Sequence, residues 1–476
     1  MNKNLLYKIL ITFIFVLGAA LRIYAFIPYR ALWRDECNLA LSIYFHNFAD
    51  LWGVLEHMQS APPIFMTVCK IFNSVNPYFP EYFLRLFPLI SGLVAIYLFY
   101  KLTTKLYESD LAILAANFLF AVNTKLIYFS HEFKQYSSDT AVLLALLLYF
   151  MNFDIANMSR KKLVAHSFII ALCPFLSLPS VFVIASWFCL NLIQKANLKR
   201  LFLIVLPALV LNLFYYIHTL IPSRKIMLKY FNFLWQNGFL EFNINSVTSI
   251  IKNNIHFYFN ECMFILIPVC LLFLGLIIML KRRNKLDKLI LYTLGFVILA
   301  SFMKIYPIDG RVSLYLLPLI IAISVIPLAV CKQNVLKITC IILLMMITGR
   351  FNMKDIINTN IEPPSYMMQI LKYNYKPGEY IIYNDVSDSQ FAIYEHIYDL
   401  QVPQDKIGVI QLTDYSESWY YSVLDLLPKN NKYWFYYAND LNSKPVIVLL
   451  KNWVNKNGNV LYEKDFNNAC LLYVQL

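Results

Sequence analysis

The sequence predicts a polytopic α-helical membrane protein that carries a C-terminal α/β domain outside the membrane. Hydrophobic residues make up 59% of the 476 residues and charged residues only 14%, whereas soluble domains average about 25% charged residues. The mean hydropathy is +0.56. Apolar stretches recur through the first 349 residues, and the pattern changes after them. An ordinary soluble protein is therefore excluded, and the lipid bilayer is the expected surrounding.

About eleven transmembrane helices follow from these stretches, since a span needs about 20 mostly apolar residues. The first stretch reaches Ile27 and is longer than the apolar core of a cleaved signal peptide, so we expect it to be retained. The short stretches on either side of Pro179 leave open whether 164–193 forms one kinked span or two. The expected spans are 5–27, 84–100, 110–128, 138–153, 164–178, 180–193, 201–221, 262–280, 288–303, 312–330 and 335–349.

The basic residues between the spans indicate the orientation. If the N-terminus is cytoplasmic, every short loop on the cytoplasmic side carries Lys or Arg, as the positive-inside rule requires. The loop at 281–285, for example, holds four basic residues. Three regions are then expected on the non-cytoplasmic side: 28–83, 222–261 and the chain after about residue 350.

The net charge and the cysteines argue against two other classes of protein. The formal charge is +13, but many of the basic residues lie in short loops between apolar stretches, so no nucleic-acid partner is predicted. The nine cysteines are scattered without paired spacing. Neither a disulfide framework nor a cysteine metal site is therefore predicted.

The chain after residue 350 alternates short helical and strand patterns and contains the turn signal Pro377-Gly378. We therefore divide the chain into a transmembrane domain, 1–349, and an extracytoplasmic α/β domain, 350–476. Helices are expected at 364–374, 388–398, 416–427 and 444–456, and strands at 379–384, 407–411, 432–437, 459–465 and 469–475.

The first outer region begins with an acidic pair, Asp35 and Glu36, directly after a membrane helix. Ionisable groups at this depth are candidates for function. The alternative is that Asp35 caps an amphipathic helix expected at 38–58 and lying in the membrane interface; both interpretations can hold together. Pro62-Pro63 then predicts the start of another short helix, because proline is tolerated in the first helical turn.

Two more polar clusters lie at outer ends of expected spans. The first, at 128–139, includes Glu132, Lys134 and Tyr136, and its alternative is a loop that is polar only for solvation. The second, at 304–311, ends in Arg311 at the start of a helix, where the helix dipole disfavours a cation unless an anion is bound. Arg85 also begins a span on this side, either as a phosphate contact or as a cation reaching the interface.

These clusters bring three acids and three cations to one face from distant parts of the sequence. Cations on the outer side oppose the positive-inside bias and need a reason. A phosphate group supplies one, since Lys and Arg are its usual partners. A carboxylate beside that phosphate could take a proton from an acceptor hydroxyl or amine.

The same residues form an ordered set that resembles the GT-C glycosyltransferases, in particular bacterial relatives of protein mannosyltransferases and of the lipid A aminoarabinose transferase. The likeness covers about the first 350 residues, and the strand entry after Lys376 is similar to the extra domain of such bacterial proteins. The motifs are Trp33-Arg34-Asp35-Glu36, Gln59-Ser60-Ala61-Pro62-Pro63, Leu84-Arg85-Leu86, Glu132-x-Lys134-x-Tyr136 and Tyr306-Pro-x-x-Gly310-Arg311.

The resemblance implies inverting transfer of a sugar from a polyprenyl-phosphate donor, on the outer face of a bacterial inner membrane, to a glycan, lipid or protein acceptor. It assigns Asp35 as the catalytic base with Glu36 beside it, and gives Glu132 a place in the acceptor or base site. The donor phosphate would be bound by Arg85, Lys134, Tyr136 and Arg311.

The resemblance makes no cofactor certain. Some GT-C enzymes use a divalent metal ion, which stays open here, and cations could replace it because the leaving group is already a phosphate. The histidine that often precedes the Pro-Pro pair in relatives is replaced by Ala61, which leaves only His57 and His131 nearby. A transporter or flippase of a lipid-linked saccharide is the main alternative, and a surface-polysaccharide polymerase or ligase is another.

Overall fold

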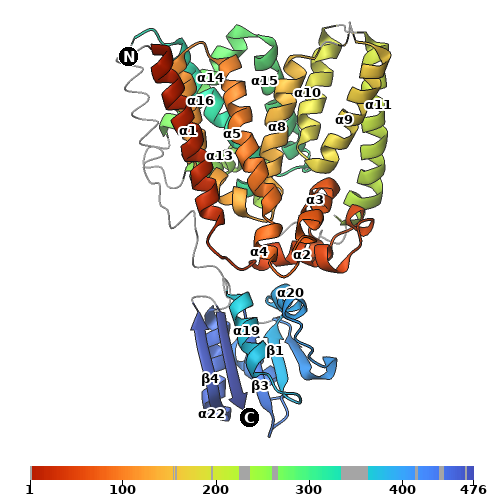
Figure 1. Ribbon diagram of the computed structural model, residues 1–476, viewed down its shortest axis with the longest axis vertical. Helices are drawn as coiled ribbons and strands as arrows, with labels where there is room; N and C mark the ends of the chain where they lie inside the picture. Colours follow the sequence, from red (N-terminus) through yellow and green to blue (C-terminus); the bar gives the residue numbers. More distant parts are fainter. Residues whose placement is uncertain are drawn as a thin grey trace.

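The computed structural model describes residues 3–476 except for 154, 156–157, 195–196, 224–235, 260–265, 334–362, 413–415, 439–443 and 467–468. A bundle of long helices forms one end of the molecule and a small sheet with helices forms the other (Figure 1). The bundle helices are α1 (Lys3–Phe26), α5 (Leu86–Leu106), α6 (Asp110–Val122), α7 (Thr124–Tyr128), α8 (Tyr136–Met151), α9 (Arg160–Leu176), α10 (Ser180–Ile193), α11 (Leu198–Tyr215), α14 (Leu266–Arg282), α15 (Lys285–Phe302) and α16 (Leu317–Val330).

These helices lie in the stretches predicted as spans, except that the predicted span 335–349 lies outside the described residues. The region 164–193 forms two helices, broken at the extended residue Ser177 and restarted after Pro179. Within the described residues, four helices are long and apolar enough to cross a membrane, or five if α6 and the helix bent by 53° after it are one span. The number of about eleven spans is therefore not confirmed, because several bundle helices have fewer than the roughly 20 residues that a span needs.

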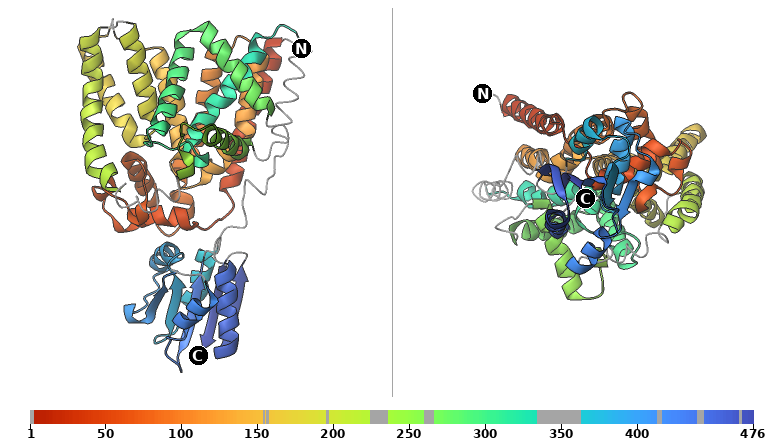
Figure 2. Two further views of the ribbon diagram at one scale, coloured as in Figure 1. Left: turned by 180° about the vertical axis from the view of Figure 1, so that it is seen from behind. Right: turned by 90° about the horizontal axis from the view of Figure 1, so that it is seen from below.

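The predicted cytoplasmic loops lie together at one end of the bundle. Arg282 is the last residue of α14, and its guanidinium donates a hydrogen bond of 3.0 Å to the carbonyl of Leu106, the last residue of α5. Lys285, at the start of α15, reaches the Phe153 carbonyl at 3.1 Å. The N-terminus lies at the end of the bundle away from the sheet (Figures 1 and 2). The basic loops and the C-terminal sheet are thus at opposite ends of the molecule (Figure 1).

The predicted amphipathic helix at 38–58 is wrong. The helix α2 (Arg34–Phe45) ends before an extended His46, and 3-10 turns follow at Asp50–Trp52 and Glu56–Met58. The side-chain oxygen of Asn47 accepts hydrogen bonds from the backbone N–H groups of Ala49 and Asp50. The Asp50 carboxylate accepts a hydrogen bond from the backbone N–H group of Asn47. Such local side-chain bonds compete with the helical hydrogen bonds and end the helix.

The short helices of the outer region continue with α3 (Pro63–Asn73) and α4 (Pro80–Phe83), and α13 (Ile244–Phe259) belongs to the second outer region. Proline occupies the first turn of α3, as predicted from Pro62-Pro63. Figure 1 shows α2, α3 and α4 at the edge of the bundle that faces the C-terminal sheet.

The C-terminal region folds as a five-stranded sheet in the order β2-β1-β3-β5-β4. The strand β1 pairs in parallel with β2 and β3, whereas β5 is antiparallel to both β3 and β4. The predicted elements match the observed ones closely: α19 (Pro364–Asn374), β1 (Tyr380–Asn384), α20 (Asp388–Tyr398), β2 (Ile407–Ile410), α21 (Glu417–Leu424), β3 (Lys432–Tyr437), α22 (Lys444–Asn457), β4 (Asn459–Phe466) and β5 (Ala469–Gln475).

Helices cover both faces of this sheet, which explains why the side chains of its central strands β1 and β3 are buried from the second residue of each strand onward. Ile382 faces α21 and α22, whereas its neighbours Ile381 and Tyr383 face α19 and α20. The core beside α19 and α20 does not stop at the sheet. It continues into the outer region of the bundle through buried residues such as Leu32 and Cys37. One apolar core therefore joins α20 to the segment that carries the acidic pair.

Candidate functional site

The first turn of α2 places Asp35 between two cations from distant parts of the chain. The Lys134 ammonium lies 3.2 Å from one carboxylate oxygen of Asp35, and the Arg311 guanidinium donates to the other at 2.8 Å. The Asp35 side chain is 19% exposed and that of Lys134 only 6%. The three predicted residues thus form one centre, called the Asp35 centre below, that is largely shielded from water.

Asp35 does not act as the helix cap. Trp33 occupies the cap position in an extended conformation, and its N–H is accepted by the Glu36 carboxylate at 3.4 Å. The Asp35 side chain instead provides the anion that explains Arg311. This arginine lies in the first turn of a 3-10 helix (Gly310–Leu316) that leads into α16, where a cation is favourable only beside a negative charge.

The charges of the Asp35 centre control its protonation. Burial would raise the pKa of the Asp35 carboxyl, but Lys134 and Arg311 outweigh it and hold the pKa below its usual value. Burial lowers the pKa of the Lys134 ammonium, and the neighbouring Asp35 offsets only part of this effect. Asp35 is therefore ionised at neutral pH.

Glu36 and Arg85 form a separate buried pair that holds the backbone. Arg85 donates to both carboxylate oxygens of Glu36 and to the carbonyls of Arg30, Ala31 and Glu81. These bonds occupy all five N–H groups of a guanidinium. Glu36 also accepts the Phe133 N–H at 2.7 Å and so ties the loop of Lys134 to α2. The Arg85 guanidinium therefore has no free N–H group with which to bind a phosphate, although the sequence had led us to expect such a contact. The Glu36 carboxylate faces the backbone rather than the Asp35 centre.

Glu132 is a fully buried acid whose two carboxylate oxygens make no hydrogen bond within the described part of the chain. Burial, reinforced by the negative charge of Glu36, raises the pKa of Glu132 to about 7. Tyr136, the first residue of α8, packs edge-on against Phe129 at 5.1 Å. Its phenol lies within electrostatic range of Arg311, Asp35 and Glu132. Both predicted residues thus border the Asp35 centre.

We expect the protein to lose stability as the pH rises from about 4.5 to 7. The folded state holds a proton on Glu132 up to about pH 7, whereas an unfolded Glu releases it near 4.3. A group with a raised pKa contributes stability that is full below the unfolded pKa and is lost as the pH passes the folded pKa, here up to about 3 kcal/mol. Thermal unfolding in detergent from pH 4.5 to 8 should show this fall. The variant Glu132→Gln should show a smaller fall than the wild type, and an equal fall in the variant would contradict the assignment.

Three residues to which the sequence assigned no role lie around these acids and cations. Gln59 accepts a hydrogen bond from the Lys134 ammonium at 2.7 Å. The Arg311 guanidinium lies over the Trp33 indole at 5.9 Å, and Arg30 lies 3.7 Å from Glu36. Gln59 and Trp33 stand within the ordered motifs, but only the folded loop brings their side chains to the cations.

Neither histidine near the Pro-Pro pair reaches the Asp35 carboxylate. His131 is buried, and its ring Nδ1 bonds the Ile127 carbonyl at 3.1 Å. His57 lies 3.8 Å from Asp388 of α20 and has a left-handed backbone with φ of 46°. Neither His57 nor His131 therefore binds the Asp35 carboxylate.

The residues around Asp35 do not fit a divalent metal ion. The described residues contain no group of three or more His, Cys, Asp or Glu side chains that could hold one. Both oxygens of Asp35 face cations, Lys134 and Arg311, which would repel a third. The two cations face one carboxylate, so the centre keeps a positive charge that favours an anion such as phosphate.

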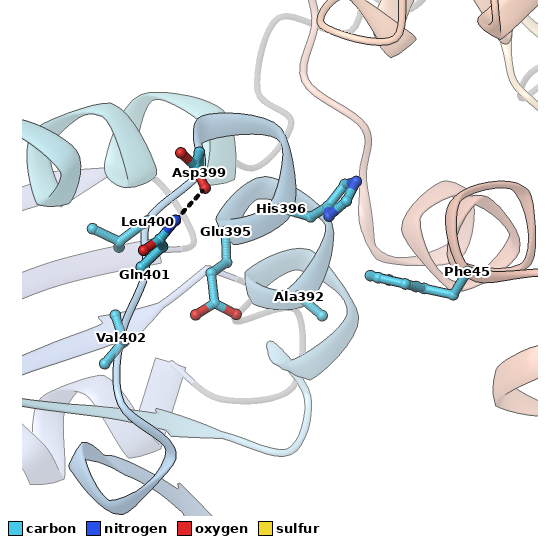
Figure 3. A pocket seen from close by; sticks show the side chains of 8 residues that line it. All are labelled: Phe45, Ala392, Glu395, His396, Asp399, Leu400, Gln401 and Val402. Carbon is cyan, nitrogen blue, oxygen red and sulfur yellow. Dashed lines mark hydrogen bonds between the residues drawn. The ribbon is translucent and has the colours of Figure 1, made fainter.

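A separate pocket of about 290 Å³ lies where α20 meets the end of α2 (Figure 3). It is lined by Phe45 and by residues of α20 and the following turn, among them Glu395 and Asp399. The His396 ring points toward Phe45, with ring centroids 5.3 Å apart. No residue of the Asp35 centre lines this pocket. It therefore belongs to the junction between the bundle and the C-terminal region and not to the candidate catalytic site.

Comparisons with known proteins agree with the fold predicted from the motifs. ArnT from Cupriavidus metallidurans, in a crystal structure bound to undecaprenyl phosphate, is similar with a TM-score of 0.55 and 12% identity over 98% of this chain and 97% of that chain. Its apo state gives a TM-score of 0.55 and 11% identity over 96% and 97% of the two chains. The Archaeoglobus fulgidus oligosaccharyltransferase, in complex with zinc and sulfate, gives 0.53 and 12% identity over 81% of this chain and 61% of that chain.

No protein-family model and no curated protein matches this sequence. The similarity is therefore to solved structures, and at such low sequence identity it shows a common fold and nothing more. The chain therefore shares the fold of these two proteins, which agrees with the fold expected from the resemblance.

Proposed function

We propose that this chain is an inverting membrane glycosyltransferase that takes its sugar from a polyprenyl-phosphate donor. The single observation that carries the proposal is the position of Asp35 between Lys134 and Arg311 in a GT-C-like fold. A structural neighbour was crystallised with undecaprenyl phosphate, which supports a donor of this class. Residues 1–349 would form the transmembrane catalytic domain and residues 350–476 the extracytoplasmic domain, in a bacterial inner membrane with the N-terminus in the cytoplasm.

The Asp35 carboxylate acts as the base in this mechanism. It accepts the proton of an acceptor hydroxyl or amine while the acceptor atom bonds to the anomeric carbon of the sugar. The bond between that carbon and the phosphate oxygen breaks at the same time, and the polyprenyl phosphate leaves with the electron pair. Attack opposite to the leaving group inverts the configuration at the anomeric carbon.

The cations stabilise the charge of the leaving phosphate, which grows as the bond breaks. Lys134 and Arg311 have this task, with the Tyr136 hydroxyl as a further donor, because these groups border the Asp35 carboxylate. Glu132 lies beside them and would shape the acceptor side. Glu36 and Arg85 act as positioning residues for the backbone of 30–36, in place of the direct roles expected from the sequence.

Purified protein should transfer sugar from at least one member of a panel of radiolabelled polyprenyl-phosphate sugars. The product should be a β-glycoside from an α-linked donor, or the reverse, which NMR of the isolated product would show. Movement of an intact lipid-linked saccharide across vesicles, with no glycoside formed from any donor, would instead favour the transporter or flippase.

We expect Lys134→Met to raise the donor KM by about 10-fold or more, since a charge-assisted hydrogen bond contributes about 1.5–3 kcal/mol. Steady-state kinetics with varied donor concentration measures this. Lys304→Met is the matched control, because Lys304 is 60% exposed on the same side and pairs with Glu241. If the donor KM is unchanged in Lys134→Met, or rises equally in both variants, Lys134 does not bind the donor phosphate.

A further inference from the structure

A buried tyrosine of the C-terminal α/β region contacts the segment before Asp35, next to the hydrogen bond between Tyr29 and Ser365. The Tyr394 hydroxyl, on α20, accepts the backbone N–H of Leu32 at 2.8 Å and donates to the Glu81 carboxylate at 2.8 Å. Tyr394 and Leu32 are both fully buried. Leu32 stands before the first turn of α2, so its N–H group has no helical partner, and Tyr394 is the group that satisfies it.

This hydrogen bond completes a set that fixes three successive residues. Arg85 binds the carbonyls of Arg30 and Ala31, at 2.7 and 3.2 Å, and Tyr394 binds the next N–H group, that of Leu32. Glu81 joins the two anchors, because its carbonyl accepts from Arg85 and its carboxylate accepts from Tyr394. Asp35 follows only three residues later, so its place relative to Lys134 and Arg311 depends on this segment.

A second contact from the same helix reaches the other side of the centre. Asp388, the first residue of α20, lies 3.8 Å from His57. Two residues further on, Gln59 binds the Lys134 ammonium. The helix α20 thus touches both segments that flank the Asp35 centre, and Figure 1 shows it on the side of the sheet that faces α2 and α4.

We propose that Tyr394 is a positioning residue for Asp35, and that the C-terminal domain is thereby a part of the active-site scaffold rather than a separate binding module. The inference rests on the proposed function. Tyr394 touches neither substrate nor Asp35; it acts through the backbone of Leu32. Loss of its hydroxyl leaves the Leu32 N–H group buried without a partner, and the segment 30–36 loosens.

The test compares Tyr394→Phe with Tyr398→Phe on the same helix. The Tyr398 hydroxyl also makes two hydrogen bonds, but to Ser365 and Gln369 within the C-terminal region. We expect Tyr394→Phe to lower kcat by about 10-fold with an unchanged donor KM, since small misplacement of a reacting group is costly. Tyr398→Phe should keep both values. Hydrogen exchange followed by mass spectrometry should become faster across 30–36 in Tyr394→Phe only.

The outcomes separate this inference from the proposed function. An active wild type with unchanged kcat and unchanged exchange in Tyr394→Phe overturns the positioning role alone. Equal loss of kcat in both tyrosine variants also overturns it, because general destabilisation of α20 would then suffice. Absence of transfer by the wild type counts against the proposed function, whereas the exchange experiment still tests the contact between Tyr394 and Leu32.

Discussion

The variant Asp35→Asn should lose sugar transfer by about 10²–10⁴-fold in kcat, the range that general-base catalysis supplies. The amide keeps the size of the side chain but can no longer accept a proton from the acceptor. It also removes the negative charge that faces Lys134 and Arg311. Both cations would then be free to bind phosphate, so the donor KM should stay equal or fall. Transfer assays with varied donor concentration measure the two constants separately.

The matched control is Asp50→Asn, in the same outer region. The Asp50 carboxylate accepts the Asn47 N–H at 3.2 Å, a bond that an amide oxygen also accepts. Its kinetics should equal those of the wild type. Retention of wild-type kcat by Asp35→Asn would show that Asp35 is an anchor for the two cations, and the base would have to be sought elsewhere, with the buried Glu132 as the next candidate.

The sequence predicted the long helices and the C-terminal sheet well because their signals are local. Apolar stretches predict helices in a membrane protein, and β1 and β3 are short runs rich in Ile and aromatic residues. The helix expected at 38–58 failed because Asn47 and Asp50 form a local turn, which outweighs an amphipathic pattern when no long apolar face supports it. The number of spans also stays unconfirmed, since helix length was not readable from hydropathy alone.

The candidate site was predictable in composition but not in pairing. The acids and cations at 35, 134 and 311 meet as the motifs indicated, yet nothing in the order of residues shows which cation faces which acid. The sequence suggested that Arg85 binds phosphate because it lies at the outer end of a helix. In the structure its guanidinium makes five hydrogen bonds to Glu36 and to backbone carbonyls instead. Tyr394 gave no signal, because its partner Leu32 lies 362 residues away and offers only a backbone N–H group.

The second large effect is expected from Arg85→Met, which should destabilise the fold by about 3–5 kcal/mol, the usual result of removing one partner of a buried ion pair. Glu36 would keep a buried charge without its main counterion, and three carbonyls would lose a donor. Thermal unfolding in detergent measures the change. The double variant Arg85→Met with Glu36→Gln should recover part of it, because the stranded charge is then removed as well.

The same experiment decides between the two roles considered for Arg85. If Arg85 held the donor phosphate, Arg85→Met would raise the donor KM and leave the unfolding temperature near that of the wild type. A positioning role predicts the reverse: a large loss of stability and, in the protein that remains folded at low temperature, an unchanged donor KM. Lys304→Met provides the scale, since an exposed pair such as Lys304 with Glu241 contributes only about 0–1 kcal/mol. If Arg85→Met loses no more stability than Lys304→Met, the positioning role is contradicted and phosphate binding becomes the favoured role of Arg85.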